Sequence, residues 1–225
     1  KKIIGVMQAR MGSSRLPGKV FLPLADRPLV WHIMTRLRAV KSISDIFIAT
    51  TSDKKNDVLE DFSNKNQIIC YRHSDENDIV GRFNAISKLV DYDVMIKVNC
   101  DCPLIDNNEI QKLLDIFLEK KLDFASNQFS NTYPLGYSFQ ILHSDLIKKC
   151  DYFLSNKTDR ELFIKWIMDN KESFKTDTIS YKRNMSKLRL TLDTKEDYLL
   201  MKRIFEKLFV KNEIFGIKEV LNFLN

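Results

Sequence analysis

Glycine and proline are scarce in this sequence, with 6 Gly and 5 Pro among 225 residues. So few chain breakers exclude a collagen-like protein and a long flexible linker. No uninterrupted apolar run approaches the roughly 20 residues that a membrane-spanning helix needs. With 44% hydrophobic and 29% charged residues, the composition is that of a globular domain rather than a disordered chain or a coiled coil.

Cysteine is also sparse, and its spacing suggests neither a metal site nor a disulfide framework. Of Cys70, Cys100, Cys102 and Cys150, only the middle two lie close together. A single C-x-C pair, without a second pair or a histidine cluster, is a poor zinc signal. A reducing cytoplasm is therefore the setting that we expect.

The first residues resemble a secretion signal only weakly. Two lysines and a short apolar run are interrupted by Gln8 and Arg10, and no small-residue cleavage site follows. We interpret this stretch as a buried first strand. Because the chain does not begin with Met, we also expect it to have been trimmed.

The charge balance favours an anionic partner. Net charge is +6, from 36 basic and 30 acidic residues. This excess fits a nucleotide, a nucleic acid or a membrane surface equally well. The lysines are spread along the chain, as in Lys54-Lys55 and Lys148-Lys149, which is typical of solvated helix faces. We therefore expect a small anionic ligand, and neither nucleic acid nor membrane.

Strand and helix signals alternate through the first 120 residues. Short apolar runs predict strands, and helically spaced apolar residues predict helices between them. The predicted strands cover 3–8, 45–50, 68–71 and 93–98, and the helices cover 29–40, 58–62, 79–90 and 110–117. This order predicts an α/β fold with a mostly parallel, Rossmann-like sheet covered by helices.

The second half is less regular. Residues 122–142 mix Asn, Ser, Pro and Gly with strand-like stretches, which predicts an inserted antiparallel hairpin region. A helix is expected at 159–168, a strand at 188–192 and a last helix near 217–223. Thr194, with Asp197 three residues later, forms a capping-box pattern that predicts a helix from about Lys195.

The loop after the first strand carries the strongest signal for chemistry. Residues 8–19 read QARMGSSRLPGK, with Arg10, Arg15 and Lys19 as three cations close together. Glycines and serines let backbone N–H and hydroxyl groups approach phosphate oxygens. The loop is not a P-loop, because Val20 follows Gly18-Lys19 where Ser or Thr would be required. We predict phosphate binding; an ordinary basic surface turn is the alternative.

Two further loops place carboxylates at the ends of predicted strands. Asp101 follows the strand at 93–98, and Asp193 follows the one at 188–192. Ligands of parallel sheets bind beyond the carboxyl ends of strands, and Mg²⁺ takes one or two carboxylates together with phosphate oxygens. The two aspartates could converge on one metal, although a turn role for Asp101 stays open. Asp106 reads as a helix N-cap.

Four motifs in one order resemble a known family. They are the loop at 8–19, D-x-x-x-R-F at 78–83, D-C-P-L-I-D at 101–106 and L-T-L-D-T-x-E-D at 190–197. This set resembles the cytidylyltransferases of the spore-coat polysaccharide F-like branch, related to the acylneuraminate and KDO cytidylyltransferases. The resemblance spans most of the chain.

The resemblance implies a nucleotide-diphospho-sugar-transferase-like fold, helices on both sheet faces, CTP as substrate and Mg²⁺ as cofactor. It implies a single domain with a nucleotide-binding part at 1–120, an acceptor and dimerisation part at 121–187, and a C-terminal part at 188–225. It implies Asp101 and Asp193 as metal ligands and Arg15, Lys19 and Asp101 as catalytic residues. The nucleotide-binding residues expected on this basis are Ala9, Arg10, Met11, Gly12, Ser13, Arg15, Lys19, Arg82 and Asn99.

Two departures from the branch concern the acceptor. The usual G-x-D-x-E reads Gly136-Tyr137-Ser138-Phe139-Gln140 here, so both carboxylates are missing. The usual R-E-H-V reads R-E-L-F at 160–163, without the histidine. Both lie away from the CTP motifs, so the sequence predicts the nucleotide better than the acceptor.

The expected reaction is transfer of CMP from CTP to an anionic acceptor, an acidic sugar or a phosphorylated or phosphonate compound, with release of pyrophosphate. The resemblance implies a place in surface polysaccharide biosynthesis. A glycosyltransferase of similar fold and a catalytically silent nucleotide-binding protein are the alternatives. The first is disfavoured because Asn99-Cys100-Asp101 replaces the Asp-x-Asp that such enzymes often carry. We also expect a homodimer with Tyr133, Tyr137 or Phe139 at its contact, since aromatic residues on an exposed strand favour pairing.

Overall fold

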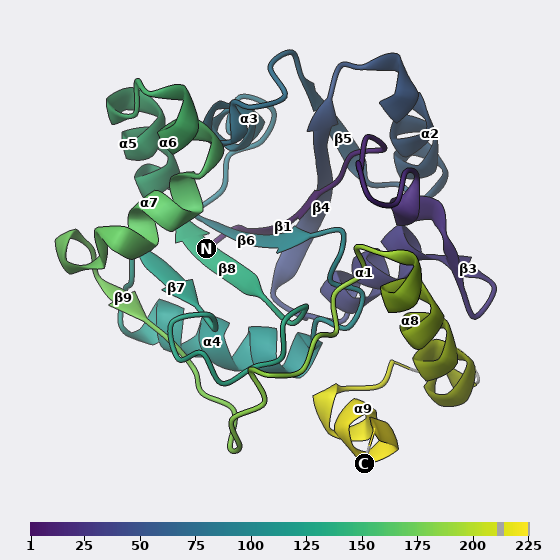
Figure 1. Ribbon diagram of the computed structural model, residues 1–225. Coiled ribbons are helices and arrows are strands. Elements are labelled where there is room, and N and C mark those ends of the chain that lie inside the picture. Colours follow the sequence, from purple (N-terminus) through teal and green to yellow (C-terminus); the bar gives the residue numbers. More distant parts are fainter. Residues whose placement is uncertain (211–213, 225) are drawn as a thin grey trace.

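A seven-stranded sheet forms the centre of the molecule, in the order β5-β4-β1-β6-β8-β7-β9 (Figure 1). The computed structural model describes residues 1–210 and 214–224. The strands of this sheet are β1 (Ile3–Gln8), β4 (Ile43–Thr51), β5 (Ile69–His73), β6 (Val94–Asn99), β7 (Phe124–Ser126), β8 (Phe139–His143) and β9 (Thr176–Asp177). β5, β4, β1 and β6 are parallel, whereas β8 is antiparallel to both β6 and β7. The predicted parallel sheet and antiparallel hairpin are both confirmed.

Helices cover both faces of this sheet, as predicted (Figure 1). One apolar core contains side chains from the sheet and from α1, α2, α4, α8 and α9, and the other contains side chains from the opposite face and from α3, α5 and α7. The helices are α1 (Leu29–Arg38), α2 (Asp57–Lys65), α3 (Ile79–Ile86), α4 (Asn107–Glu119), α5 (Ser144–Phe153), α6 (Lys157–Glu161), α7 (Phe163–Asp169), α8 (Lys195–Leu208) and α9 (Ile217–Leu224). Short 3₁₀ turns lie at Lys19–Phe21, Lys54–Asn56 and Lys171–Ser173, and β2 (Pro23–Leu24) pairs with β3 (Arg27–Pro28).

The local signals for helix starts are confirmed. The Asp106 carboxylate accepts hydrogen bonds from the backbone of Asn108 and Glu109 at the start of α4. Thr194 and Asp197 form the reciprocal capping box at the start of α8. These side chains satisfy backbone donors that a helix leaves free at its N-terminus, which is why short-range sequence patterns predict them.

Two elements differ from the prediction. The expected helix at 159–168 is two short helices, α6 and α7, because Leu162 leaves helical geometry between them. The expected strand at 188–192 makes only an isolated bridge, between Leu135 and Arg189. Its backbone pairs first with Leu135 and then with Asp101, so it joins no neighbouring strand over its length.

The predicted location of a dimer contact is wrong. Tyr133, Tyr137 and Phe139 are buried within the chain itself, with 7%, 1% and 1% of their surface exposed. Tyr137 and Phe139 belong to the core formed with α1, α4 and α8. Because β7 and β8 join the main sheet rather than standing out from it, their aromatic side chains have a core to fill. Three buried aromatics give no reason to expect a partner at that place.

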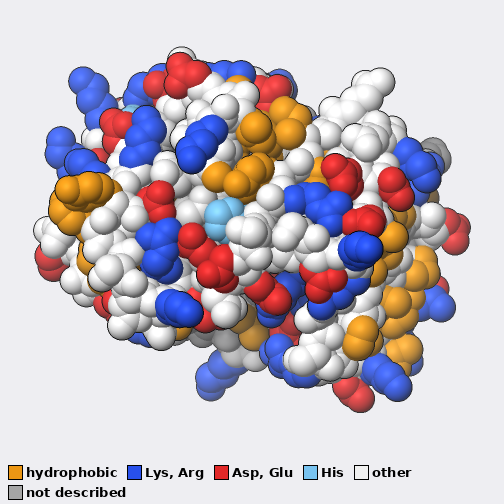
Figure 2. All heavy atoms as spheres, turned by 90° about the horizontal axis from the view of Figure 1, so that it is seen from above, with side chains coloured by type: hydrophobic (Ala, Val, Ile, Leu, Met, Phe, Trp, Pro, Cys, Tyr) orange, Lys and Arg blue, Asp and Glu red, His pale blue; other side chains and the backbone are white. Residues whose placement is uncertain are grey.

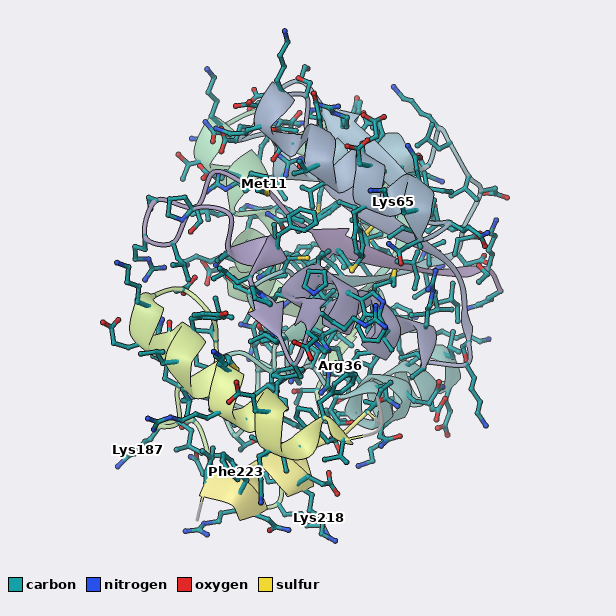
Figure 3. The ribbon with its side chains drawn as sticks, turned by 90° about the vertical axis from the view of Figure 1, so that its right-hand side faces the viewer. Met11, Arg36, Lys65, Lys187, Lys218 and Phe223 are labelled. Carbon is teal, nitrogen blue, oxygen red and sulfur yellow. The ribbon has the colours of Figure 1, made fainter. Side chains whose placement is uncertain are left out.

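The C-terminal segment packs back onto the first helix. Arg36 of α1 donates hydrogen bonds to the carbonyls of Ile105 and Phe215, at 3.1 and 2.8 Å. Figure 3 shows Arg36 close to the interior and Phe223 on the outer part of α9.

On the face shown in Figure 2, acidic and basic side chains are intermingled, as expected for solvated helix surfaces. Within the described residues, no helix combines the length and apolar character needed to span a bilayer.

Candidate functional site

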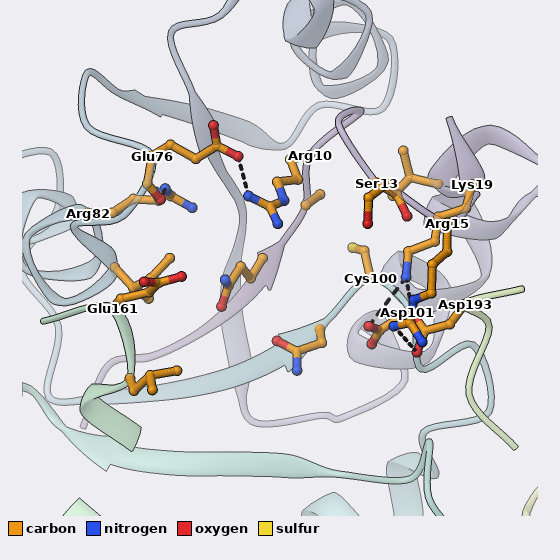
Figure 4. Close-up of a pocket in the computed structure, with 17 residues that line it drawn as sticks. Arg10, Ser13, Arg15, Lys19, Glu76, Arg82, Cys100, Asp101, Glu161 and Asp193 are labelled. Carbon is orange, nitrogen blue, oxygen red and sulfur yellow. Dashed lines mark hydrogen bonds and ion pairs between the residues drawn. The ribbon is translucent and has the colours of Figure 1, made fainter. Parts of the chain in front are cut away.

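A cleft of about 360 Å³ lies at the carboxyl ends of β1 and β6 (Figure 4). These strands are hydrogen-bonded neighbours, and Gln8 stands opposite Asn99 in their register. The loops that follow them therefore meet at one edge of the sheet, as the topology rule for parallel sheets predicts. The cleft is lined by Gln8, Ala9, Arg10, Ser13, Ser14, Arg15, Lys19, Val20, Glu76, Ile79, Arg82, Asn99, Cys100, Asp101, Glu161, Leu162 and Asp193.

All the predicted site residues line this cleft except Met11 and Gly12. The backbone N–H of Met11 donates to Asn56 Oδ1 at 2.9 Å, and its carbonyl accepts from Ser13 and Gly18 at 3.0 and 3.1 Å. Gly18 has a φ of 69°, which closes the loop and starts the turn that carries Lys19. The backbone of Met11 thus stabilises the conformation of the loop. Neither Met11 nor Gly12 lines the cleft.

Lys19 lies between the two predicted metal-binding aspartates. Its ammonium is 2.7 Å from Asp193 Oδ1 and 3.4 Å from Asp101 Oδ2 (Figure 4). It also donates a hydrogen bond to the Leu192 carbonyl at 3.0 Å. Two carboxylates that are 92 positions apart in the numbering therefore converge on one cation. Only the tertiary structure reveals that Lys19 connects them.

The extended segment before α8 is held against the Asp101 loop by its backbone. The Leu192 N–H and the Thr191 hydroxyl both donate to the Asp101 carbonyl, at 2.8 and 3.0 Å. Gly136 permits this approach, because a Cβ at its φ of 104° would lie 2.1 Å from the Leu190 carbonyl oxygen. A glycine at this place therefore helps to position Asp193 beside Asp101.

Cations surround Asp193 on three sides. Besides Lys19, the Arg15 and Arg189 guanidinium groups approach its carboxylate to 3.1 and 3.4 Å. Burial alone would raise the pKa of Asp193, but these three cations together outweigh it and hold the pKa below the usual range. Asp193 is therefore ionised at neutral pH and can serve as a ligand for a cation.

The opposite side of the cleft combines Arg10, Arg82 and an acidic residue that the sequence did not single out. Glu76 forms an ion pair with Arg10, and its carbonyl accepts a hydrogen bond from Arg82 at 2.7 Å (Figure 4). Glu76 follows β5, another parallel strand whose carboxyl end points to the same edge. The rule that identified Asp101 would therefore also have pointed to Glu76.

The R-E-L-F segment at 160–163 both joins two helices and contributes to the lining of the cleft. Arg160 binds the Asp78 carboxylate with two nitrogens, at 2.9 and 3.0 Å, and so ties α6 to the start of α3. Glu161 and Leu162 turn toward the cleft and line it. Leu162 occupies the position at which the resemblance leads us to expect a histidine, so an apolar side chain stands beside Glu161 on this wall of the cleft.

The donor set at Asp101 and Asp193 suits a magnesium ion that is shared with a polyphosphate. Mg²⁺ is usually held by one or two carboxylates, with phosphate oxygens and water completing an octahedron. A group of three or more His, Cys, Asp or Glu side chains suited to a metal does not occur in the part of the chain that the structure describes. The four cysteines form no disulfide. The two aspartates thus fit Mg²⁺ far better than zinc.

Comparison with known proteins gives one consistent family. A family model described as cytidylyltransferase matches residues 4–214. An uncharacterized protein of Methanocaldococcus jannaschii is 31% identical over 229 residues, which cover 100% of this chain and 90% of that protein. The spore coat polysaccharide biosynthesis protein SpsF of Bacillus subtilis is 27% identical, over 99% of this chain and 94% of SpsF.

A solved structure agrees with these relatives. A cytidylyltransferase from Leptospira borgpetersenii superposes with a TM-score of 0.92 at 30% sequence identity, covering 99% of this chain and 93% of that one. A superposition of this extent shows that the two chains share the whole fold. It confirms the fold that the four sequence motifs predicted.

Proposed function

Because the chain belongs to the cytidylyltransferase family, we propose that it transfers CMP from CTP to an anionic acceptor and releases pyrophosphate. The acceptor in this proposal is an acidic sugar or a small phosphorylated or phosphonate compound. The observation that carries it is the cleft in which a cationic loop and two converging carboxylates face each other. The likeness to a spore coat polysaccharide protein supports a role in surface polysaccharide biosynthesis.

The loop after β1 supplies the groups for the triphosphate. Arg10, Ser13 and Arg15 point toward the cleft from this loop (Figure 4). Guanidinium groups match phosphate oxygens with paired hydrogen bonds, and a fixed array of donors lowers the barrier by stabilising charge that develops during transfer. In this proposal Arg15 and Lys19 hold the departing pyrophosphate, while Ala9, Arg82 and Asn99 complete the nucleotide site.

Asp101 and Asp193 would hold Mg²⁺ against the phosphates. When bound there, the ion supplies charge neutralisation on the attacking and leaving oxygens of an in-line displacement. Lys19 also acts before the substrate binds, because its ammonium holds the two carboxylates close together and compensates part of their negative charge. Catalysis by the chain's own residues is then mainly positioning and electrostatic stabilisation.

Several broader features belong to the same proposal. Residues 1–120 bind nucleotide, 121–187 meet the acceptor, and 188–225 bring the second aspartate. A cytoplasmic location is consistent with four cysteines that form no disulfide.

We also propose that the protein is a homodimer whose contact does not include the buried aromatic side chains. Light scattering tests it, and a mass near 26.4 kDa at micromolar concentration would contradict it.

The decisive test measures pyrophosphate. The protein is incubated with each nucleoside triphosphate and Mg²⁺ against a panel of sugar acids, sugar phosphates and phosphonates. CTP should be the only efficient donor, and an Asp101→Asn variant should lose the signal. A parallel incubation replaces the triphosphates with nucleotide sugars. If these are consumed without pyrophosphate release, the protein is a glycosyltransferase, and if no pyrophosphate appears with any triphosphate and acceptor, CMP transfer is contradicted.

A binding experiment tests the role of Lys19 separately. Its position beside both aspartates predicts contact with the distal phosphates rather than with the CMP part. Calorimetry on Lys19→Ala should therefore show a much larger loss of affinity for CTP than for CMP. An equal loss for both nucleotides would place Lys19 elsewhere in the bound state.

A further inference from the structure

The two carboxylate oxygens of Asp101 have different partners. Lys19 lies 3.4 Å from its Oδ2, on the side of the cleft (Figure 4). The thiol of Cys102 donates a hydrogen bond to its Oδ1 at 3.2 Å. Cys102 is 3% exposed, whereas 30% of the Asp101 side chain is exposed. One expected metal ligand is therefore held both by a cation in the cleft and by a neutral group in the interior.

Cys102 acts as the donor in this contact. A carboxylate has no proton to give, whereas a thiol has one S–H. Sulfur is a weak donor, but a hydrogen bond to a charged acceptor is roughly twice as strong as one between neutral groups. Because Cys102 is buried, water has little access to this contact. The hydrogen bond therefore restrains the rotation of the Asp101 carboxylate about its last side-chain bond.

Ser138 supports the thiol from a distant part of the chain. Its hydroxyl lies 3.8 Å from Cys102 Sγ, although the two residues are 36 positions apart. Since the one proton of the thiol is given to Asp101, the hydroxyl is the donor in this second contact. Ser138 directly precedes β8, which pairs with β6. Hydroxyl, thiol and carboxylate thus form a series of hydrogen bonds that leads from β8 to the cleft.

This series of contacts shows what the departure at position 138 changes. The resemblance leads us to expect Asp there, and this protein has Ser. An aspartate would accept rather than donate, so it would compete with Asp101 for the single thiol proton. It would also add a third carboxylate near Asp101 and Asp193. With Ser138 the neighbouring group is a neutral donor, and the thiol proton remains with Asp101.

The arrangement leaves one oxygen of Asp101 for a metal. Oδ1 is held by Cys102, and Oδ2 faces Lys19. Mg²⁺ tolerates little deviation from octahedral geometry, so the direction in which a ligand oxygen points matters for its binding. Groups that hydrogen-bond to a metal ligand fix that direction, and losing one typically weakens metal binding or activity by about 10- to 100-fold. Cys102 occupies such a place.

We propose that Cys102 is a positioning residue for magnesium: its thiol holds Asp101 so that Oδ2 points to the place where Lys19 now lies. Ser138 supports the thiol in this task. This inference rests on the proposed function, because Mg²⁺ belongs to that reaction. Cys102 itself does not line the cleft, so it acts through Asp101 and not on the nucleotide or the acceptor. The thiol is neither a metal ligand nor a nucleophile in this role.

Substitutions at Cys102 separate the hydrogen bond from the volume of the sulfur. Cys102→Ala removes the donor, and Cys102→Ser keeps a hydroxyl donor of smaller size. Ser138→Ala removes only the supporting hydroxyl. Cys150→Ala is the matched control, because this thiol is about as buried, at 2% exposed, and packs in the core on the other face of the sheet. Thermal unfolding in EDTA shows that each variant folds without metal.

Mn²⁺, which accepts the same carboxylate ligands as Mg²⁺, is the probe for the metal site. Electron paramagnetic resonance measures its binding to the protein without nucleotide. Cys102→Ala should bind Mn²⁺ at least about 10-fold more weakly than the parent, and Ser138→Ala should show a smaller loss. Cys102→Ser should recover most of the affinity, and Cys150→Ala should match the parent.

The affinity for CMP in EDTA is the control for the nucleotide site. It should stay that of the parent in every variant, because this binding involves no metal. Equal Mn²⁺ binding by Cys102→Ala and the parent would overturn the inference. So would a Cys102→Ser protein that recovers nothing, or a parent protein that binds no Mn²⁺.

Infrared spectroscopy tests the hydrogen bond itself. The S–H stretching band lies apart from other protein bands, and a hydrogen bond to a carboxylate lowers its frequency. The band lost in Cys102→Ser should therefore lie below the one lost in Cys150→Ala, and Asp101→Ala should raise it. A Cys102 band at the same frequency as that of Cys150 would contradict the contact.

Pyrophosphate release with Mg²⁺ separates this inference from the proposed function. If the parent releases pyrophosphate and Cys102→Ala needs no more Mg²⁺ than the parent, the reaction stands and the positioning role fails. If Mn²⁺ binding depends on Cys102 but the parent releases no pyrophosphate with any acceptor, the positioning role stands and the transferase reaction fails.

Discussion

Removing the ammonium of Lys19 should make the unliganded protein less stable and more dependent on magnesium. In the structure this one cation separates the Asp101 and Asp193 carboxylates, at 3.4 and 2.7 Å. Lys19→Met keeps most of the side chain's volume and removes only the charge. The variant therefore leaves two carboxylates facing each other, with Arg15 and Arg189 near Asp193 alone.

The size of the effect follows from burial. Breaking a fully buried ion pair by removing one partner costs about 3–5 kcal/mol, whereas exposed pairs contribute less than about 1 kcal/mol. The side chains of Lys19, Asp193 and Asp101 are 11%, 16% and 30% exposed, which places this cluster between the two cases. We expect a loss of about 2–3 kcal/mol. In a protein of this length that lowers the melting temperature by roughly 4–12 °C.

Magnesium should reverse this loss selectively. In the parent protein the ion competes with Lys19 for the carboxylates, whereas in the variant it meets them unpaired. A ligand at 100 times its dissociation constant stabilises a protein by about 2.7 kcal/mol, which matches the expected deficit. Mg²⁺ should therefore raise the melting temperature of Lys19→Met clearly more than that of the parent.

The assay is thermal and urea unfolding of both proteins with EDTA and with an Mg²⁺ titration. Lys88→Met serves as the control for a lost surface charge, and it should show neither the deficit nor the added response to Mg²⁺. A Lys19→Met protein as stable as the parent in EDTA would refute the electrostatic account of the cluster. Equal magnesium responses in the two proteins would refute the two aspartates as the binding site of the ion.

Three more outcomes follow from the structure. Asp101→Asn should reduce turnover by at least roughly 100-fold, because one ligand of the proposed metal is lost. The circular dichroism spectrum of the variant should match that of the parent protein. Near-normal rates with Mg²⁺ would contradict the metal assignment. Gly136→Ala should lower the free energy of unfolding in urea by about 3 kcal/mol or more, because a Cβ at its φ of 104° meets the Leu190 carbonyl. A variant as stable as the parent would show that the segments around Gly136 and Leu190 separate easily. His32 is buried, which lowers its pKa to about 4, and its Nε2 donates to the Leu24 carbonyl at 2.7 Å. The unfolded chain therefore takes up this proton below about pH 6.5 and the folded chain only near 4, so stability should fall by up to roughly 3 kcal/mol as the pH drops across that range. His32→Gln should lack this part of the pH dependence in urea titrations, and an unchanged slope would contradict it.

The sequence by itself determined the features that depend on neighbours along the chain. Apolar runs and helical spacing predicted β1, β4, β5, β6 and the helices between them, because each element needs one continuous face for the core. The helix starts at Asp106 and Thr194 followed from hydrogen bonds that span only a few residues. The loop at 8–19 and Asp101 followed from the rule that parallel strands present their ligands at one edge. The family resemblance rested on the same local motifs.

The tertiary structure decided what depends on residues far apart in the chain. No spacing shows that Lys19 lies between Asp101 and Asp193, since that contact needs both the sheet register and the crossing of residues 188–192. The segment at 188–192 looked like a strand because its side chains are apolar, but its place in space gives it only one bridge.

Burial was the second property that the sequence left open. Tyr137 belongs to the core because β7 and β8 join the main sheet, although its local pattern fits an exposed hairpin equally well. Lys97 looks like any strand lysine until its register partner is known to be Gln140 and its surroundings closed to water. Long-range packing determines the environment of each side chain. It is therefore long-range packing that buries the Lys97 ammonium beside the cleft without a carboxylate partner among the described residues.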